Sequence, residues 1–314
     1  MKKVFQSHFV TFLKGMAMGA ADVVPGVSGG TIALITHIYE RLIKAIDKVS
    51  LSLVLQLSGK KRKEAWRSLD GTFLLALVLG IGTSILLVSG GISWLIHTYP
   101  IPVWAFFFGL ILGSAFLLKA TVTTWNLASI SFLLIGSMIA LGIGLIAPSG
   151  GSENLLYLFF CGMLVIIAMI LPGISGAFIL ILLGVYETAL EIVEQLKSLK
   201  LEGIIAFLVM ASGGLIGLKV FARTLRWLFT IQKNNLLATM TGFLIGSLYK
   251  VWPWKVTTEF YINRSGEQVP ISSIAVLPNI SEVSSQFTIA LGTFFLALII
   301  LVIVEKLSKK ISHA

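Results

Sequence analysis

Six long apolar runs constrain what this chain can fold into more than any other feature. They lie near residues 71–96, 102–118, 128–147, 203–222, 236–252 and 286–304. A helix of about 20 apolar residues crosses a bilayer, so each run predicts a transmembrane helix. The composition agrees, because 56% of the residues are hydrophobic and only 12% are charged, well below the charged share of a soluble domain. The sequence therefore predicts an all-α, polytopic membrane protein.

Two further apolar regions, 8–39 and 154–190, are each interrupted by a Pro-Gly pair. Proline removes a backbone donor and clashes with the preceding turn, and glycine is entropically costly in a helix. We expect a helix to break at each pair, and each region to form a re-entrant hairpin that leaves the membrane on the side from which it entered.

The two broken regions belong to an internal repeat. Residues 25–40 and 172–187 are identical at seven of 16 positions, which are Pro, Gly, Ser, Gly, Ile, Tyr and Glu. A second match joins Gly-Leu-Ile-Leu-Gly-Ser at 109–114 to Gly-Phe-Leu-Ile-Gly-Ser at 242–247. Two matches in the same order, with the difference in spacing confined to a loop, favour duplication. Each half would hold one broken hairpin and three spans. The predicted halves are residues 1–150 and 151–314.

The charge of the loops predicts their side of the membrane. The loop 41–70 holds eight basic side chains, namely Arg41, Lys44, Lys48, Lys60, Lys61, Arg62, Lys63 and Arg67. Basic loops stay in the cytoplasm, so we place this loop and both termini there, which puts 191–202 and 253–285 outside. An odd number of crossings per half makes the halves inverted copies. In secondary transporters with this pattern, the binding site lies where two broken elements meet near the midplane.

The two breaks supply the candidate binding residues. Backbone N–H groups at a helix N-terminus attract anions, and irregular backbone at membrane depth must face protein or a wet cavity. The alternative is that the glycines only form tight turns or let helices pack closely. The residues expected to bind an anion are Pro25, Gly26, Ser28, Gly29, Gly30, Thr31, Pro172, Gly173, Ser175 and Gly176.

Ionisable residues in or near the apolar regions are functional candidates, because charges in a bilayer are costly. Asp22, Glu40 and Glu187 are candidates for proton or cation coupling. For the two glutamates, anchoring at the headgroup level is the alternative. Lys219, Arg223 and Arg226 recur on one face of a helix. Arg223 is a candidate phosphate ligand, although such a stripe more often flanks the cytoplasmic end of a span.

Composition also argues against several kinds of partner. Cys161 is the only cysteine, so no internal disulfide can form, and no Cys/His spacing suits a metal. The net charge of +10 need not indicate nucleic acid, because basic residues of membrane proteins meet anionic lipid. We expect no metal, no cofactor and no nucleic-acid partner. The oligomeric state stays open, with a homodimer as one option.

The segment Gly19–Leu34, which surrounds the first Pro-Gly pair, closely resembles the signature of a bacterial membrane family associated with polyprenyl-phosphate transport. The resemblance covers essentially the whole chain, although the second copy is more degenerate, with Ala177 and Phe178 in place of Gly30 and Thr31. The family's motif maps onto Asp22, Pro25, Gly26, Ser28, Gly29, Gly30 and Thr31, and in weaker form onto Pro172, Gly173, Ser175 and Gly176.

This resemblance implies a translocase that returns undecaprenyl phosphate, the lipid carrier of cell-wall precursors, to the cytoplasmic leaflet of the bacterial inner membrane. A carrier of a small soluble anion is the alternative within transport. A membrane lipid phosphatase and a scaffold are alternatives from other classes. No catalytic spacing involves His8, His37, His97 or His313, so we expect a transporter and not an enzyme.

Overall fold

The computed structural model describes most of the chain. The described residues are 2–24, 27–146, 150–152, 154–262, 268–278 and 284–312. Two predicted site residues, Pro25 and Gly26, lie outside them, so nothing follows here about the position of either.

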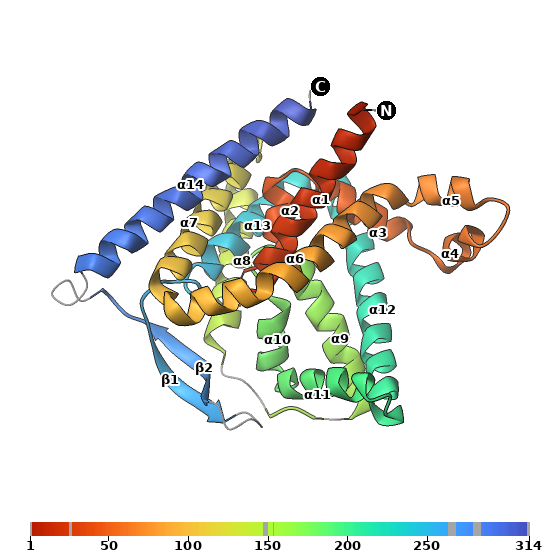
Figure 1. Ribbon diagram of the computed structural model, residues 1–314. Helices are drawn as coiled ribbons and strands as arrows, with labels where there is room; N and C mark the ends of the chain where they lie inside the picture. The colour runs from red at the N-terminus through yellow and green to blue at the C-terminus, as the bar shows by residue number, and fades with distance from the viewer. Residues whose placement is uncertain are drawn as a thin grey trace.

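Helices form nearly all of the regular structure (Figure 1). The helices are α1 (Lys2–Asp22), α2 (Gly29–Ile35), α3 (Tyr39–Lys48), α4 (Leu51–Leu57), α5 (Arg62–Ser68), α6 (Gly71–Thr98), α7 (Pro100–Lys119), α8 (Leu127–Leu145), α9 (Leu155–Ile170), α10 (Gly176–Leu182), α11 (Tyr186–Lys197), α12 (Leu201–Ile231), α13 (Lys233–Ser247) and α14 (Ser284–Ser312). Among the described residues, α6, α7, α8, α12 and α14 contain stretches long and apolar enough to span a membrane. The prediction of a polytopic all-α membrane protein is therefore confirmed.

The predicted loops contain more structure than expected. The basic segment 41–70 folds into most of α3 and all of α4 and α5. The segment 253–285 contains an antiparallel hairpin of β1 (Lys255–Ile262) and β2 (Gln268–Ala275), because β1 is rich in the β-branched and aromatic residues that favour strands. These elements lie at the ends of the predicted spans and add to the helical architecture without replacing any of it.

Two predicted spans have different ends. The helix α12 continues to Ile231, beyond the predicted end at residue 222, so Arg223 and Arg226 lie on the same helix as Lys219. The helix α13 is 15 residues long and is followed by a turn. That turn precedes Pro253, and proline disfavours helix in the residue before it.

The first broken region reverses direction as predicted. Asp22 ends α1, and α2 begins at Gly29. At the far end of α2, the backbone carbonyl of Thr36 accepts a hydrogen bond of 2.7 Å from Lys14 Nζ. Because Lys14 lies about two helical turns before the end of α1, the chain returns alongside the helix that it has just left.

The second broken region has the same local structure. The helices α9 and α10 flank the break, and Tyr157 Oη donates to the Leu183 carbonyl at 2.8 Å. Leu183 ends α10 as Thr36 ends α2. The residue after each has positive φ, 58° at His37 and 64° at Gly184, which fixes the same sharp turn before α3 and α11.

Long helices pack in corresponding pairs in the two halves. In the first half α1 packs on α6, and in the second half α9 packs on α12. Two further pairs join the halves, α7 with α14 and α8 with α13. Glycines permit this close approach. A Cβ added at Gly80 of α6 would overlap the Phe12 carbonyl oxygen of α1.

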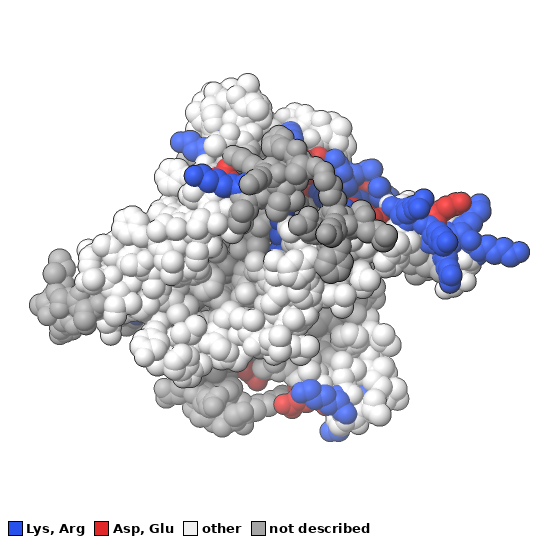
Figure 2. Space-filling model, turned by 45° about the horizontal axis from the view of Figure 1, so that its top comes forward, with Lys and Arg blue, Asp and Glu red and all other residues white. Residues whose placement is uncertain are grey.

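The ends of the helices define two faces of the molecule. Both termini lie toward one face, with α3, α4 and α5 near it, and α11 and the β-hairpin lie toward the opposite one (Figure 1). Lys and Arg gather around the first face and over the α4–α5 segment, whereas a smaller group of mixed charge lies at the other end (Figure 2). We call the first the α3 face and the second, after the β-hairpin of β1 and β2, the hairpin face.

Replacing Gly80 with valine should disrupt the contact between α1 and α6. The added side chain meets backbone that cannot move aside, and overpacking of this kind costs about 1–3 kcal/mol. Gly82→Val is the matched control in the same helix, because a Cβ there meets nothing within 4 Å. Thermal unfolding in detergent should show a lower midpoint for Gly80→Val alone. Equal midpoints for the two variants would contradict this packing.

Candidate functional site

The two breaks contact each other inside the molecule. Ser28 Oγ lies 3.1 Å from the carbonyl oxygens of both Met169 and Leu171, and donates its one proton to this pair. Gly173 N donates to Thr31 Oγ1 at 3.1 Å. Ser28 and Thr31 are both fully buried. The segments 28–31 and 169–173, far apart in the sequence, therefore form one interface.

These hydroxyl groups replace a hydrogen bond that the second break removes. In an unbroken helix, Gly173 N–H would bond to the Met169 carbonyl four residues earlier. Here the amide bonds to Thr31 and the carbonyl bonds to Ser28. Unpaired backbone groups are costly away from water, so the second break needs the first to satisfy these two groups.

Glycines allow the two segments to come this close. A Cβ on Gly30 would overlap the Ile170 carbonyl oxygen. Gly173 has φ of 80°, a left-handed conformation that other residues seldom adopt. The glycines are thus required for packing at this interface, as the alternative interpretation of the motif held, whether or not they also bind a ligand.

The Asp22 carboxylate lies at the N-terminus of α2, where an external anion was expected. Its Oδ1 accepts from Gly29 N at 2.6 Å. Gly30 N donates to Ser28 Oγ, and Thr31 N donates to the Ser28 carbonyl. A carboxylate at this position is favoured by the helix dipole. The amides of Gly29, Gly30 and Thr31 are therefore occupied in this conformation, and an anion at Gly29 would have to displace Asp22.

The second break lacks this carboxylate. Met169 stands at the position that corresponds to Asp22, and a Cβ on Gly176 would lie 2.5 Å from its Cγ. Ser175 is buried and its side chain makes no capping hydrogen bond to α10. The two hairpins thus share a backbone shape but differ in charge at the tip.

A large apolar groove lies against the first hairpin. It encloses about 650 Å³ and is lined by both arms, through Ala17, Ala20 and Ala21 of α1 and Ile32 and Ile35 of α2. Apolar residues of α6, α7 and α14 complete it. The groove therefore runs beside a hairpin whose tip is polar.

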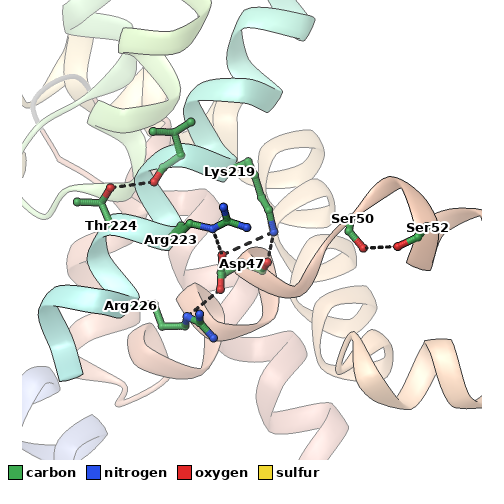
Figure 3. A network of polar contacts seen from close by, with 8 residues as sticks. Asp47, Ser50, Ser52, Lys219, Arg223, Thr224 and Arg226 are labelled. Carbon is green, nitrogen blue, oxygen red and sulfur yellow. Dashed lines mark hydrogen bonds and ion pairs between the residues drawn. The ribbon is translucent and has the colours of Figure 1, made fainter.

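Asp47 of α3 forms ion pairs with three basic residues of α12 (Figure 3). Arg226 Nε lies 2.8 Å from Asp47 Oδ2, and Lys219 Nζ and Arg223 Nε each lie 3.6 Å from Oδ1. Lys219 also donates to the Asp47 carbonyl. Three cations around one carboxylate leave an excess of positive charge at the α3 face. The Arg223 side chain is 71% exposed, so this candidate phosphate ligand is accessible there, away from the breaks.

The other two candidate carboxylates do not join Asp22. Glu40 lies in the first turn of α3, where Lys44 Nζ lies 2.7 Å and Lys233 Nζ 3.7 Å from its carboxylate. The hydrogen bond from Lys44 holds the pKa of Glu40 below its usual range, so this group stays ionised near neutral pH. Glu187 lies in the first turn of α11. Of these three carboxylates, only Asp22 has a hydrogen bond to a described residue of the breaks.

Sequence reasoning missed two features of the site region. Asp47 looked like one charge in a basic loop, and only the packing of α3 on α12 gives it three partners. Lys250 lies beside the second break, where it lines a small cavity with Gly173, Ser175 and Phe178. No motif joins it to that break, because the two segments are brought together only by the tertiary fold.

Comparisons with known proteins agree with this architecture. The chain matches, over residues 18–269, a family model described as VCA0040-like, undecaprenyl phosphate translocase-like. It is 39% identical to the polyprenyl-phosphate transporter of Vibrio cholerae, with 97% of this chain and 98% of that protein covered. It is 31% identical to the polyprenyl-phosphate transporter of Staphylococcus aureus, with 79% and 87% covered. No solved structure matches the chain. The protein belongs to the undecaprenyl phosphate translocase-like family.

Proposed function

We propose that this protein moves polyprenyl phosphate, as undecaprenyl phosphate, between the leaflets of the bacterial cytoplasmic membrane and so recycles the carrier for cell-envelope synthesis. The observation that carries the proposal is the apolar groove of about 650 Å³ lined by both arms of a hairpin whose tip is polar. Such a groove suits a lipid better than a small soluble anion. The names of the two relatives support the same substrate.

The groove would hold part of the isoprenoid tail. Burying apolar surface contributes about 25 cal/mol per Å², but a tail that leaves lipid for protein gains less than one that leaves water. The groove would therefore serve mainly to hold the tail in place, and would add little to the free energy of binding. It keeps the tail beside α1 and α2 while the head group, which hydrocarbon excludes, passes the polar interface of the two breaks.

Asp22 would control access to the tip. While ionised, it occupies Gly29 N–H and repels a phosphate. Protonation would weaken this contact and displacement would remove it, so that the Gly29 amide becomes available to the head group, with Ser28 and Thr31 beside it. On the other side, Pro172, Gly173, Ser175 and Gly176 would form the second half of the passage. Asp22 is thus our candidate for ion coupling, whereas the pairing of Glu40 with two lysines fits anchoring.

We further propose that the two halves are inverted in the membrane, with the α3 face and both termini in the cytoplasm. The matching order of elements, the corresponding turns at His37 and Gly184, and the corresponding helix pairs support this arrangement. The excess positive charge at the α3 face fits the same orientation. Arg223 would meet the head group, or another anionic lipid, on this side.

The direct test is reconstitution of the purified protein in liposomes. A polyprenyl phosphate placed in the outer leaflet should reach the inner leaflet faster with protein than without, as read by a reagent that modifies only accessible phosphate. Release of inorganic phosphate, measured in the same vesicles, should stay at background. Transfer at the protein-free rate would contradict the proposed function, and phosphate release would indicate an enzyme.

Asp22→Asn should alter how transfer depends on pH. The amide oxygen can still accept from Gly29 N–H, but the side chain no longer carries or loses a charge. We expect transfer to fall about tenfold, the effect of ~1.4 kcal/mol on a barrier, and to lose its dependence on pH. Glu187→Gln is the control and should keep the wild-type pH profile. A wild-type profile in Asp22→Asn would end the coupling proposal.

Filling the groove should select against long tails. In Ala20→Phe, the ring would occupy space that the tail needs, and a steric cost of ~1.4 kcal/mol, within the range for overpacking, would lower apparent affinity for a long-chain polyprenyl phosphate about tenfold. A short-chain prenyl phosphate should be affected much less. Val78→Phe is the control, since Val78 is 61% exposed and lies outside the groove. Equal losses for both chain lengths, or for both variants, would contradict a tail in the groove.

A further inference from the structure

Two lysines lie together at the hairpin face, where no predicted function uses them. Lys250 follows α13, and Lys255 begins β1. Lys250 Nζ lies 4.0 Å from the centre of the Phe178 ring, and Lys255 Nζ lies 3.7 Å from the centre of the Trp104 ring. Lys255 also donates to the Lys250 carbonyl. Residues from α7, α10, α13's end and β1 thus converge around two ammonium groups.

The pair carries two positive charges without a carboxylate. Burial, followed by the charge of Lys250, lowers the pKa of Lys255 to about 7. Among the described residues, the ion pairs involve other side chains and none reaches either lysine. Aromatic faces stabilise a cation only in part. Two neighbouring cations that are partly removed from water are costly, and an anion that paired with them would lower this cost.

The position of the pair connects it to the second break. Lys250 lines the cavity that also contacts Gly173 and Ser175. It lies beyond one end of α13, whereas Lys233 begins that helix at the other end and pairs with Glu40. The lysine pair is therefore toward the end of α13 opposite to Glu40, and Lys250 lies beside the second break.

We propose that Lys250 and Lys255 form a binding site for a phosphate monoester, which receives the head group at the hairpin face before it reaches the second break. The lipid source of this phosphate rests on the proposed function, whereas the anion site itself does not. Lysine binds phosphate as a mobile point charge with several donors. Free phosphate offers the same chemistry, so the experiment must separate the two sources.

The site should bind anions less tightly as pH rises. Among the described residues, the groups that face Lys255 are Lys250, the Trp104 ring and a backbone carbonyl, so the proton on Lys255 sets how the local charge changes near neutral pH. Below about pH 7 both lysines are charged, and above it Lys255 loses its proton. A bound anion favours the charged form, and by linkage the protonated site favours the anion.

The test is calorimetric titration of the full-length protein in detergent. Sulfate is the first probe, because its charge stays constant from about pH 6 to about pH 8 while the lysine titrates. Lys250→Gln and Lys255→Gln should each weaken sulfate binding at least about tenfold, since a hydrogen bond to a charged group exceeds the free energy of a tenfold change. Lys255→Arg should retain binding and remove its pH dependence. Lys197→Gln, exposed on the same face, is the control and should bind as wild type.

Titrations with inorganic phosphate and with farnesyl phosphate show whether the bound phosphate belongs to a lipid or is free. Farnesol, which lacks the phosphate, is titrated as the control for the tail. Binding of farnesyl phosphate well above that of inorganic phosphate, with loss in both Gln variants, supports a lipid head group. Equal binding of the two supports free phosphate and overturns the lipid assignment. Sulfate binding that is absent in wild type, or unchanged in folded Lys250→Gln and Lys255→Gln, overturns the site.

Transfer in liposomes separates this proposal from the proposed function. If the wild-type protein transfers polyprenyl phosphate and Lys250→Gln and Lys255→Gln transfer it slowly, the lysine site and the proposed function are both supported. Wild-type rates in variants that have lost sulfate binding would remove the site from the transport route while the function stands. Sulfate binding without any transfer by wild type would leave the anion site and overturn the function. Thermal unfolding of each variant, with Lys255→Arg as the conservative form, shows that loss of binding is not loss of fold.

Discussion

The exchange of hydrogen bonds between the two breaks is the constraint on which the structure depends. A broken helix at membrane depth leaves amide and carbonyl groups that lipid cannot satisfy. The Ser28 hydroxyl donates to the Met169 carbonyl, and the Thr31 hydroxyl accepts from the Gly173 amide. The second hairpin therefore depends on the first to satisfy its backbone groups at the break. The packing of α1 on α6 and of α9 on α12 then fixes the long arms around this central contact.

The two hairpins repeat a backbone shape but divide the charge between them. The first carries Asp22 at its tip, and the second has Met169 there with Lys250 close by. A phosphate would thus be repelled by an ionised Asp22 and attracted by Lys250. In our proposals the lysine pair receives the head group at the hairpin face, and Asp22 decides when the first tip accepts it. This difference in charge would give the two hairpins different roles in transfer.

Much of the fold follows from the sequence because its signals are local. The apolar runs set the long helices, and Pro172 with Gly173 sets the second break. The face shared by Lys219, Arg223 and Arg226 follows from helical spacing. Helix ends were less predictable, since α12 continues past its apolar stretch to bring Arg223 and Arg226 to Asp47. That partner lies 172 residues from Lys219, and no spacing rule reaches so far.

The positions of the two breaks were predictable from the sequence, whereas the hydrogen bonds of the first break were not. Gly-rich segments beside Pro-Gly pairs indicated where the chain would break, and the two breaks do meet. The sequence suggested open amides, whereas Asp22 closes onto Gly29 in the structure. That contact depends on how α1 approaches α2, which the sequence pattern does not specify. Lys250 and Lys255 were missed for a similar reason, because only the folded chain brings them to the second hairpin.

The inverted arrangement of the two hairpins is the central claim, and labelling of single cysteines tests it most directly. In a Cys161→Ala background, Lys60→Cys probes the basic loop at the α3 face and Lys197→Cys probes the end of α11 at the hairpin face; both positions are exposed. A membrane-impermeant maleimide applied from outside should label Lys197→Cys in intact cells, and should label Lys60→Cys only after the membrane is opened. Labelling of both positions from the same side would contradict the account.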